Sequence, residues 1–305
     1  MRARRRLLLK LLLLTPRPLV WRFARTYIAG ERLDDAVATV RALNAEGCRA
    51  TVDVLGEEVT RLDEVHAFVD AYRATIDRLD AEKLDANISV KPTALGLRID
   101  ADHAFEAHVE ILERAREHGM FVRMDMEDSS VTQATLDLYQ RLRGAGFDNV
   151  GVVLQAYLRR TLHDARRLAA EGASVRLCKG IYIEPRELAY QADDLVRASF
   201  IDALEVLLRS DRAYCGIATH DEMLVFHGRR LVSERGLSGK RYEFQMLLGV
   251  DPQLRRLLVS EGHGLRVYVP YGRAWFGYSI RRLLENPRMA AHVVRNVLGF
   301  GPGRA

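Results

Sequence analysis

Residues 121–155 read FVRMDMEDSSVTQATLDLYQRLRGAGFDNVGVVLQ. Two short β-rich runs, 121–125 and 150–155, flank a segment with helical period, Gln133–Leu142. A strand, a helix and a second strand in this order form the unit from which parallel sheets are built. This stretch therefore predicts one repeat of an α/β fold.

The same alternation extends in both directions along the chain. Further strand-like runs lie at 51–55, 87–91, 174–178, 214–219, 242–247 and 265–270, and further helical patterns lie at Ala104–Glu117, Arg186–Leu208 and Glu222–Glu234. Eight strands with intervening helices over about 250 residues are typical of a (βα)8 barrel of the TIM type. A doubly wound open sheet is the competing fold, but the count of eight and the lack of a domain break favour the barrel. We therefore predict a barrel domain over residues 46–305.

Residues 1–45 are expected to form an N-terminal helical arm that includes a helix over Arg32–Asn44. Residues 2–14 read RARRRLLLKLLLL, an apolar run that Lys10 interrupts and that falls short of the roughly 20 residues of a spanning helix. A signal peptide is disfavoured because no small-residue cleavage site follows. Two interpretations stay open, a helix packed on the main domain and a cationic helix resting on an anionic membrane surface. The expected location is the cytoplasm, with peripheral contact on the inner face of the cytoplasmic membrane under the second interpretation.

The basic residues are mostly arginine and are scattered. Five of the 46 basic residues are lysines, which leaves 41 arginines. No aromatic-interleaved basic stripe is present, so we expect no nucleic-acid partner. Three cysteines without paired spacing argue for a reducing compartment and against a zinc site, so no metal site is expected.

In a (βα)8 barrel the chemistry lies at the carboxyl ends of the strands. Polar side chains stand at or just after these ends: Lys91, Asp125, Glu127, Gln155, Arg176, Lys179, Thr219, His220, Asp221, Gln245, Tyr268 and Tyr271. The chain has no G-x-S-x-G elbow, no H-E-x-x-H motif and no P-loop. A pocket of cations, carboxylates and amides without a nucleophile suits a bound cofactor, most often a flavin or another phosphate-bearing group.

A second informative segment, residues 268–287, reads YVPYGRAWFGYSIRRLLENP. Positions 278, 281, 282 and 285 share one helical face, because their spacing is i, i+3, i+4, i+7. This face carries a phenol, two guanidiniums and a carboxylate in place of an apolar stripe. Adjacent arginines beside aromatic rings suit a small carboxylate attached to an apolar body.

These segments belong to a series of motifs that resembles the monofunctional bacterial proline dehydrogenase family, flavin enzymes that oxidise L-proline to 1-pyrroline-5-carboxylate. The motifs occur in the family's order: TVDVLGE at 51–57, ISVK at 88–91, MDMEDS at 124–129, VLQAYL at 153–158, VRLCKGIY at 175–182, IATHD at 217–221, EFQML at 243–247 and YVPYGRAWFGYSIRR at 268–282. The resemblance implies a distorted barrel whose last helix sits over the strand ends. It also implies FAD as cofactor, L-proline as substrate in proline catabolism, and a membrane quinone as electron acceptor.

The resemblance further implies a role for individual residues. The substrate carboxylate would contact Lys91, Arg281 and Arg282, with Glu285 pairing with these arginines. The pyrrolidine ring would be enclosed by Tyr268, Tyr278, Tyr182 and Leu247. The catalytic residues would be Asp125, Glu127 and Arg176. Contacts to FAD would come from Met126, Gln155, Lys179, Gly180, Ile181, Thr219, His220 and Gln245.

The chain departs from the family pattern at Ile181, Ile183 and Pro92, and at Ala274 and Gly277, which replace the usual Asp and Pro of the last motif. The charged residues assigned to the site are intact, so the departures bear on fine specificity more than on the reaction. Two alternatives stay open. One is another TIM-barrel flavin oxidoreductase, similar to folate reductases and linked to NAD(P)H. The other is a non-catalytic, membrane-associated binding protein on the same fold.

Overall fold

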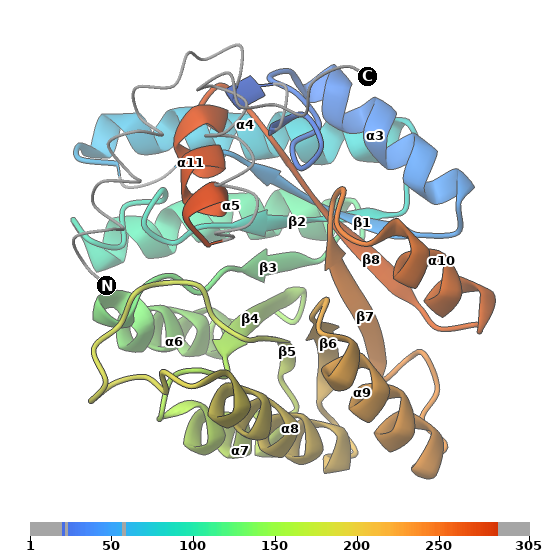
Figure 1. Cartoon of the computed structure of the whole chain (residues 1–305). Helices are drawn as coiled ribbons and strands as arrows, with labels where there is room; N and C mark the ends of the chain where they lie inside the picture. Colours follow the sequence, from blue (N-terminus) through green and yellow to red (C-terminus); the bar gives the residue numbers. More distant parts are fainter. Residues whose placement is uncertain (1–19, 22–23, 57–58, 286–305) are drawn as a thin grey trace, which may run out of the picture.

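The computed structural model describes residues 20–21, 24–56 and 59–285, and of residues 281–285 it describes only the backbone. Within these ranges eight parallel strands close into a barrel in chain order, with β1 hydrogen-bonded to β8. The strands are β1 Arg49–Val54, β2 Ala86–Val90, β3 Val122–Met124, β4 Val150–Gln155, β5 Ser174–Cys178, β6 Tyr214–Ala218, β7 Tyr242–Leu247 and β8 Leu265–Tyr271. The predicted (βα)8 barrel is confirmed, and Figure 1 shows the strands enclosed by helices.

The helices alternate with the strands as predicted. They are α3 Leu33–Ala45, α4 Leu62–Ala81, α5 Ala101–Glu117, α6 Ser129–Gly144, α7 Thr161–Ala170, α8 Asp193–Arg209, α9 Glu222–Glu234, α10 Pro252–Ser260 and α11 Trp275–Glu285. The sequence predicted a helix over Arg186–Leu208, but α8 begins at Asp193. Residues before it pair with the loop after β4, because Arg159 N donates to Leu188 O and Tyr190 N donates to Tyr157 O. This pairing holds the start of the segment in a loop.

The hydrophobic core lies between the strands and the surrounding helices. Alternate strand residues such as Val52, Ile88 and Val175 are fully buried in it. Helix α3 contributes Ala36 and Val40 to the same core. The boundary proposed at residue 45 between an arm and the barrel stays a prediction, and residues 2–14 lie outside the described residues. No helix in the described part of the chain is long and apolar enough to cross a membrane.

The interior of the barrel is polar, which is unusual for a fold whose interior is normally filled by branched apolar side chains. The strand positions that alternate with the outer core carry Thr51, Asp53, Asn87, Ser89, Arg123, Arg176, Glu243, Gln245, Arg266 and Tyr268, and most of these side chains are buried. Gly216 of β6 makes room for this layer, because a Cβ there would lie 2.5 Å from the Gln245 amide nitrogen. The barrel therefore contains an extended hydrogen-bonded network.

Candidate active site

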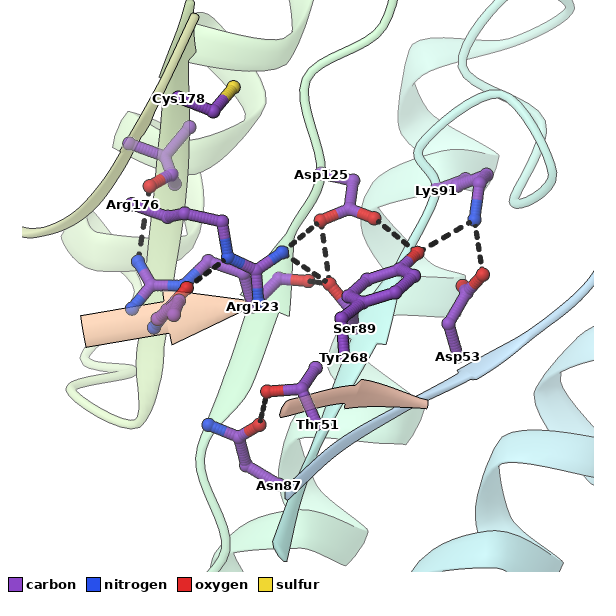
Figure 2. Close-up of polar contacts among 12 residues, drawn as sticks. Thr51, Asp53, Asn87, Ser89, Lys91, Arg123, Asp125, Arg176, Cys178 and Tyr268 are labelled. Carbon is purple, nitrogen blue, oxygen red and sulfur yellow. Dashed lines mark hydrogen bonds and ion pairs between the residues drawn. The ribbon is translucent and has the colours of Figure 1, made fainter. Parts of the chain in front are cut away.

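Asp125 and Arg176 form the centre of the network at the carboxyl ends of β3 and β5. Arg176 Nη1 donates to Asp125 Oδ1 across 2.8 Å, and Ser89 Oγ donates to the same oxygen across 2.6 Å. The two side chains keep only 10% and 15% of their surface exposed. A charge-assisted pair this close, largely removed from water, is strong and directional. The structure thus brings together two of the predicted catalytic residues, and Figure 2 shows them with Ser89 between β2 and β5.

Lys91 lies on the other side of the network, against a carboxylate from the first strand. Its Nζ donates to Asp53 Oδ2 across 2.6 Å, and Asp53 Oδ1 accepts a hydrogen bond of 3.3 Å from the Tyr72 hydroxyl of α4. Asp53 is 0% exposed and Lys91 is 7% exposed. Burial raises the pKa of Asp53, and the charge of Lys91 opposes that shift. The lysine is therefore held as half of a buried ion pair.

Tyr268 of β8 joins these two halves. Its hydroxyl donates to Asp125 Oδ2 across 3.0 Å and accepts a hydrogen bond of 3.4 Å from Lys91 Nζ. Burial raises the pKa of Tyr268 well above its ordinary value, and the nearby carboxylates raise it further. The phenol therefore stays protonated and acts as a donor. The Arg176 guanidinium also lies 5.5 Å from the centre of its ring.

The Arg176 side chain also forms a hydrogen bond to a residue of β7. Its Nε donates to Gln245 Oε1 across 2.6 Å, and Gln245 Nε2 donates to Glu243 Oε1 across 2.7 Å. Glu243 in turn accepts from Arg266 Nε across 2.6 Å. Burial would raise the pKa of Glu243, but Arg266 and the Gln245 amide lower it overall. This charged carboxylate fixes which way the Gln245 amide points, and hence where Arg176 is held.

Glu127 and Gln155, both predicted site residues, connect the carboxyl ends of β2, β3 and β4 through hydrogen bonds. The Glu127 carboxylate accepts hydrogen bonds from the backbone and hydroxyl of Thr93, and its own backbone oxygen accepts from Gln155 Nε2 across 2.8 Å. Glu127 is 5% exposed. These contacts brace the mouth of the barrel between β2 and β4. The catalytic role of Glu127 stays a prediction.

The ends of β5 and β6 carry a cluster of cations around one carboxylate. Lys179 Nζ and Arg197 Nε donate to Asp221 Oδ2 across 2.6 and 2.7 Å. Burial would raise the pKa of Asp221, but its hydrogen bonds to these cations lower it overall. Beside them, Thr219 Oγ1 accepts from Asp221 N, and His220 Nε2 accepts from Leu247 N across 2.8 Å. Because Nε2 accepts, the proton of the neutral imidazole lies on Nδ1.

The loop after β5 carries Gly180, Ile181 and Tyr182, and it requires glycine at its start. Gly180 has φ +105°, in the region that favours glycine, and a Cβ there would lie 2.0 Å from the Tyr157 ring. Further along, Glu184 accepts from Ser129 N and Oγ across 2.7 and 2.6 Å. The loop is thus fastened across the barrel mouth onto the start of α6.

Helix α11 follows β8 after a short turn. Its Tyr278 is buried and close enough to Tyr268 to raise the pKa of that phenol. Tyr278 therefore lies near Tyr268, and its part in enclosing the substrate stays a prediction. Arg281, Arg282 and Glu285 lie on the same helix, and their side chains are outside what the structure describes.

Asp53, Ser89 and Glu243 are among the network residues that were not predicted from the sequence. Asp53 and Ser89 precede the last residues of β1 and β2, and Glu243 lies near the start of β7, so none of the three stands at a strand end. A polar residue within an otherwise apolar strand, as in TVDVL at 51–55, is the pattern that could have revealed Asp53.

The fold and the site together define a class of protein: a TIM-barrel enzyme with a charged, hydrogen-bonded site at the carboxyl ends of its strands. A family model described as proline dehydrogenase matches residues 36–295. Proline dehydrogenase 2 of Bacillus subtilis (strain 168) is 36% identical over 270 residues, 88% of each chain. Proline dehydrogenase of Deinococcus radiodurans is 34% identical over 283 residues, 92% of this chain and 91% of the relative. The chain belongs to the proline dehydrogenase family.

A solved structure supports the same fold. The barrel is similar to that of proline utilization A from Bdellovibrio bacteriovorus inactivated by N-propargylglycine, with a TM-score of 0.80 and 24% identity. The match covers 92% of this chain and 36% of that longer chain. As a member of its family, this chain is a flavin-dependent enzyme that oxidises proline to 1-pyrroline-5-carboxylate in proline catabolism. The alternatives of an NAD(P)H-linked oxidoreductase and a non-catalytic binding protein are thereby set aside.

Proposed function

We propose that L-proline binds beside Lys91 at the mouth of the barrel, with its carboxylate held by Lys91, Arg281 and Arg282. The observation that carries this proposal is the placement of Lys91, which lies between Asp53 and Tyr268 at the carboxyl end of β2. Charge-assisted hydrogen bonds from ammonium and guanidinium groups to a carboxylate are short and strong. Tyr268 and Tyr278 supply the ring surfaces for the pyrrolidine, and Tyr182 and Leu247 complete the enclosure.

The flavin of this proposal is FAD, bound along the ends of β3 to β7. The donors at those ends fit a phosphate-bearing flavin: the Lys179 ammonium, the Arg176 guanidinium, the Thr219 hydroxyl and the backbone of Gly180 and Ile181. Gly180 in particular allows the backbone to approach a ligand closely. Met126, Gln155, His220 and Gln245 are the remaining proposed contacts. When bound, the flavin accepts the hydride that proline loses.

The residues of the chain position proline and control its protons. The amine of proline must be neutral before hydride can leave the adjacent carbon. The cations Lys91 and Arg176 lower the pKa of a nearby amine, because each disfavours a further positive charge. The Asp125–Arg176 pair and Tyr268 form a rigid polar surface at the bottom of the proposed proline site. Holding the substrate in a fixed orientation supplies a large share of catalysis. Glu127 is proposed to stabilise the backbone next to that surface through its hydrogen bonds to Thr93.

Electrons are proposed to leave the reduced enzyme for a membrane quinone, with the basic, Leu-rich residues 2–14 contacting the bilayer. The composition of that segment supports the proposal, since Lys and Arg beside leucines attract an anionic surface. A flotation assay with anionic vesicles tests it. The full chain should float with the vesicles and a chain lacking residues 2–14 should not; equal behaviour would contradict the proposed membrane contact.

Two measurements test the site itself. Denaturing the purified enzyme and chromatographing the released cofactor should give FAD; FMN would contradict the cofactor assignment. Lys91→Met, Arg281→Met and Arg282→Met should each raise KM for L-proline while retaining flavin, because removing one partner of the proposed charge contact with the carboxylate costs about 2–5 kcal/mol. An exposed arginine, Arg209→Met, is the control. A KM unchanged in all three variants would refute the carboxylate site.

A further inference from the structure

Asp53 is a fully buried carboxylate, and its burial is energetically unfavourable. It is the next-to-last residue of β1, has no exposure to water, and contacts Lys91 across 2.6 Å and Tyr72 across 3.3 Å. A carboxylate removed from water is destabilising unless it is paired and hydrogen-bonded. Val52 and Val54 point to the opposite face of the strand and pack in the apolar core, whereas Asp53 points into the polar interior of the barrel.

We propose that Asp53 is a positioning residue for substrate binding: it keeps the Lys91 ammonium charged and fixed at the place where the substrate carboxylate binds. This inference rests on the proposed function, in which Lys91 contacts that carboxylate. Figure 2 shows Lys91 between Asp53 and Tyr268, with Asp125 beyond the phenol.

The geometry assigns this role to Asp53 rather than to Asp125. Asp125 accepts hydrogen bonds from Arg176, Ser89 and Tyr268 and so belongs to the other half of the network. Among the carboxylates whose side chains the structure describes, Asp53 is the one in direct contact with the ammonium. A lysine side chain is long and flexible, and burial favours its neutral form unless an anion lies close by. Asp53 supplies this anion, and the Tyr72 hydroxyl of α4 orients its carboxylate by a hydrogen bond.

The proposal predicts a specific kinetic pattern for Asp53→Asn. KM for L-proline should rise at least about 10-fold, with a much smaller change in kcat, because a buried charge pair is broken at the binding step. The inhibition constant of cyclopentanecarboxylate, which has the carboxylate but no amine, should rise by the same factor. Asp70→Asn, on the exposed side of α4, is the control and should match the wild type.

The pH dependence adds a readout that a purely structural role would not move. Without Asp53 the Lys91 ammonium loses its proton more readily, so inhibition by cyclopentanecarboxylate should weaken from a lower pH upward than in the wild type. Other groups facing the pair are shared by both enzymes, so the comparison isolates Asp53. Within the described part of the chain these groups are Tyr72 from α4, Ser89 from β2, Asp125 just after β3, Arg176 from β5, Tyr268 and Tyr271 from β8, and Tyr278 from α11.

A double-mutant cycle of Asp53→Asn with Lys91→Met tests whether Asp53 acts through Lys91. If Asp53 acts through Lys91, Asp53→Asn should add little to KM in the Lys91→Met background. An unchanged KM in Lys91→Met, with KM raised in Arg281→Met and Arg282→Met, would remove Lys91 from the carboxylate site and so overturn the role of Asp53. A raised KM in Lys91→Met with an unchanged or lower KM in Asp53→Asn would overturn the role of Asp53, as would fully additive effects.

A measurement on the wild type keeps the inference testable if Asp53→Asn does not fold. The inhibition constant of cyclopentanecarboxylate should stay constant up to at least about pH 9, since a paired lysine keeps its proton as an ordinary lysine does. Weakening that begins below about pH 8 would show that Lys91 is not held charged and would overturn the inference.

Discussion

The Tyr268 hydroxyl donates to Asp125 Oδ2 across 3.0 Å, and this bond joins β8 to β3 through the interior of the barrel. It completes a path of hydrogen bonds from Asp53 through Lys91, Tyr268 and Asp125 to Arg176. The path crosses between strands that are not neighbours in the sheet. A change at one side chain is therefore expected to affect groups on several strands.

Tyr268→Phe should lower kcat/KM for L-proline by about 10- to 100-fold, since a hydrogen bond to a charged group contributes about 1.5–3 kcal/mol. The ring remains, so flavin content should be unchanged. Steady-state kinetics measure the effect. The matched control is Tyr242→Phe, whose hydroxyl contacts His263. Equal kinetics for Tyr268→Phe and the wild type would show that this hydroxyl has no part in the reaction.

Arg176→Lys should lower kcat at least about 100-fold despite keeping the charge, because an ammonium cannot reproduce a planar fork of donors. The guanidinium contacts Gln245, Asp125 and Ser89 from its Nε and Nη1 atoms. Rapid-reaction measurements of flavin reduction by L-proline would report the loss directly. Arg209→Lys on α8 is the exposed control. A reduction rate within about threefold of the wild type would contradict this role.

Gly180→Ala should destabilise the fold by more than about 2 kcal/mol and lower flavin content, because left-handed backbone strain and overpacking add together. Gly119→Ala separates the two causes. Gly119 also has positive φ, 62°, but a Cβ there would meet nothing within 4 Å. Thermal unfolding should show the larger loss at Gly180. Equal losses at both glycines would mean that the approach of Tyr157 is unimportant.

Glu243 should contribute a pH-dependent part of the stability. Its pKa is lowered overall, since the opposing effect of burial is outweighed by Arg266, the Gln245 amide and Arg49. A carboxylate with a lowered folded-state pKa stabilises the fold above its unfolded pKa, near 4.5, and loses this contribution as pH falls through the folded value. The Tm difference between wild type and Glu243→Gln should therefore shrink below about pH 4.5. A difference independent of pH would contradict the ion pair.

The fold could be predicted from sequence because its determinants are local. Strands β4, β5 and β7 begin and end where the strand-like runs of the sequence do. Helix α8 was misplaced at its start, because the backbone pairing around Leu188 is a long-range contact without a local pattern. Asp125, Arg176 and Lys91 could be selected because the fold places strand ends together. The contacts of Asp53 with Lys91 and of Glu243 with Gln245 could not be predicted, since the register of a closed barrel decides which interior side chains meet.

Oxidation of proline at this barrel mouth needs a bound flavin that proline reduces. The visible spectrum of the purified enzyme during anaerobic addition of L-proline measures this reduction. We predict that the absorption of oxidised flavin is lost on addition of L-proline and not on addition of NADH. Flavin that stays oxidised in excess L-proline, or that NADH reduces instead, would contradict it.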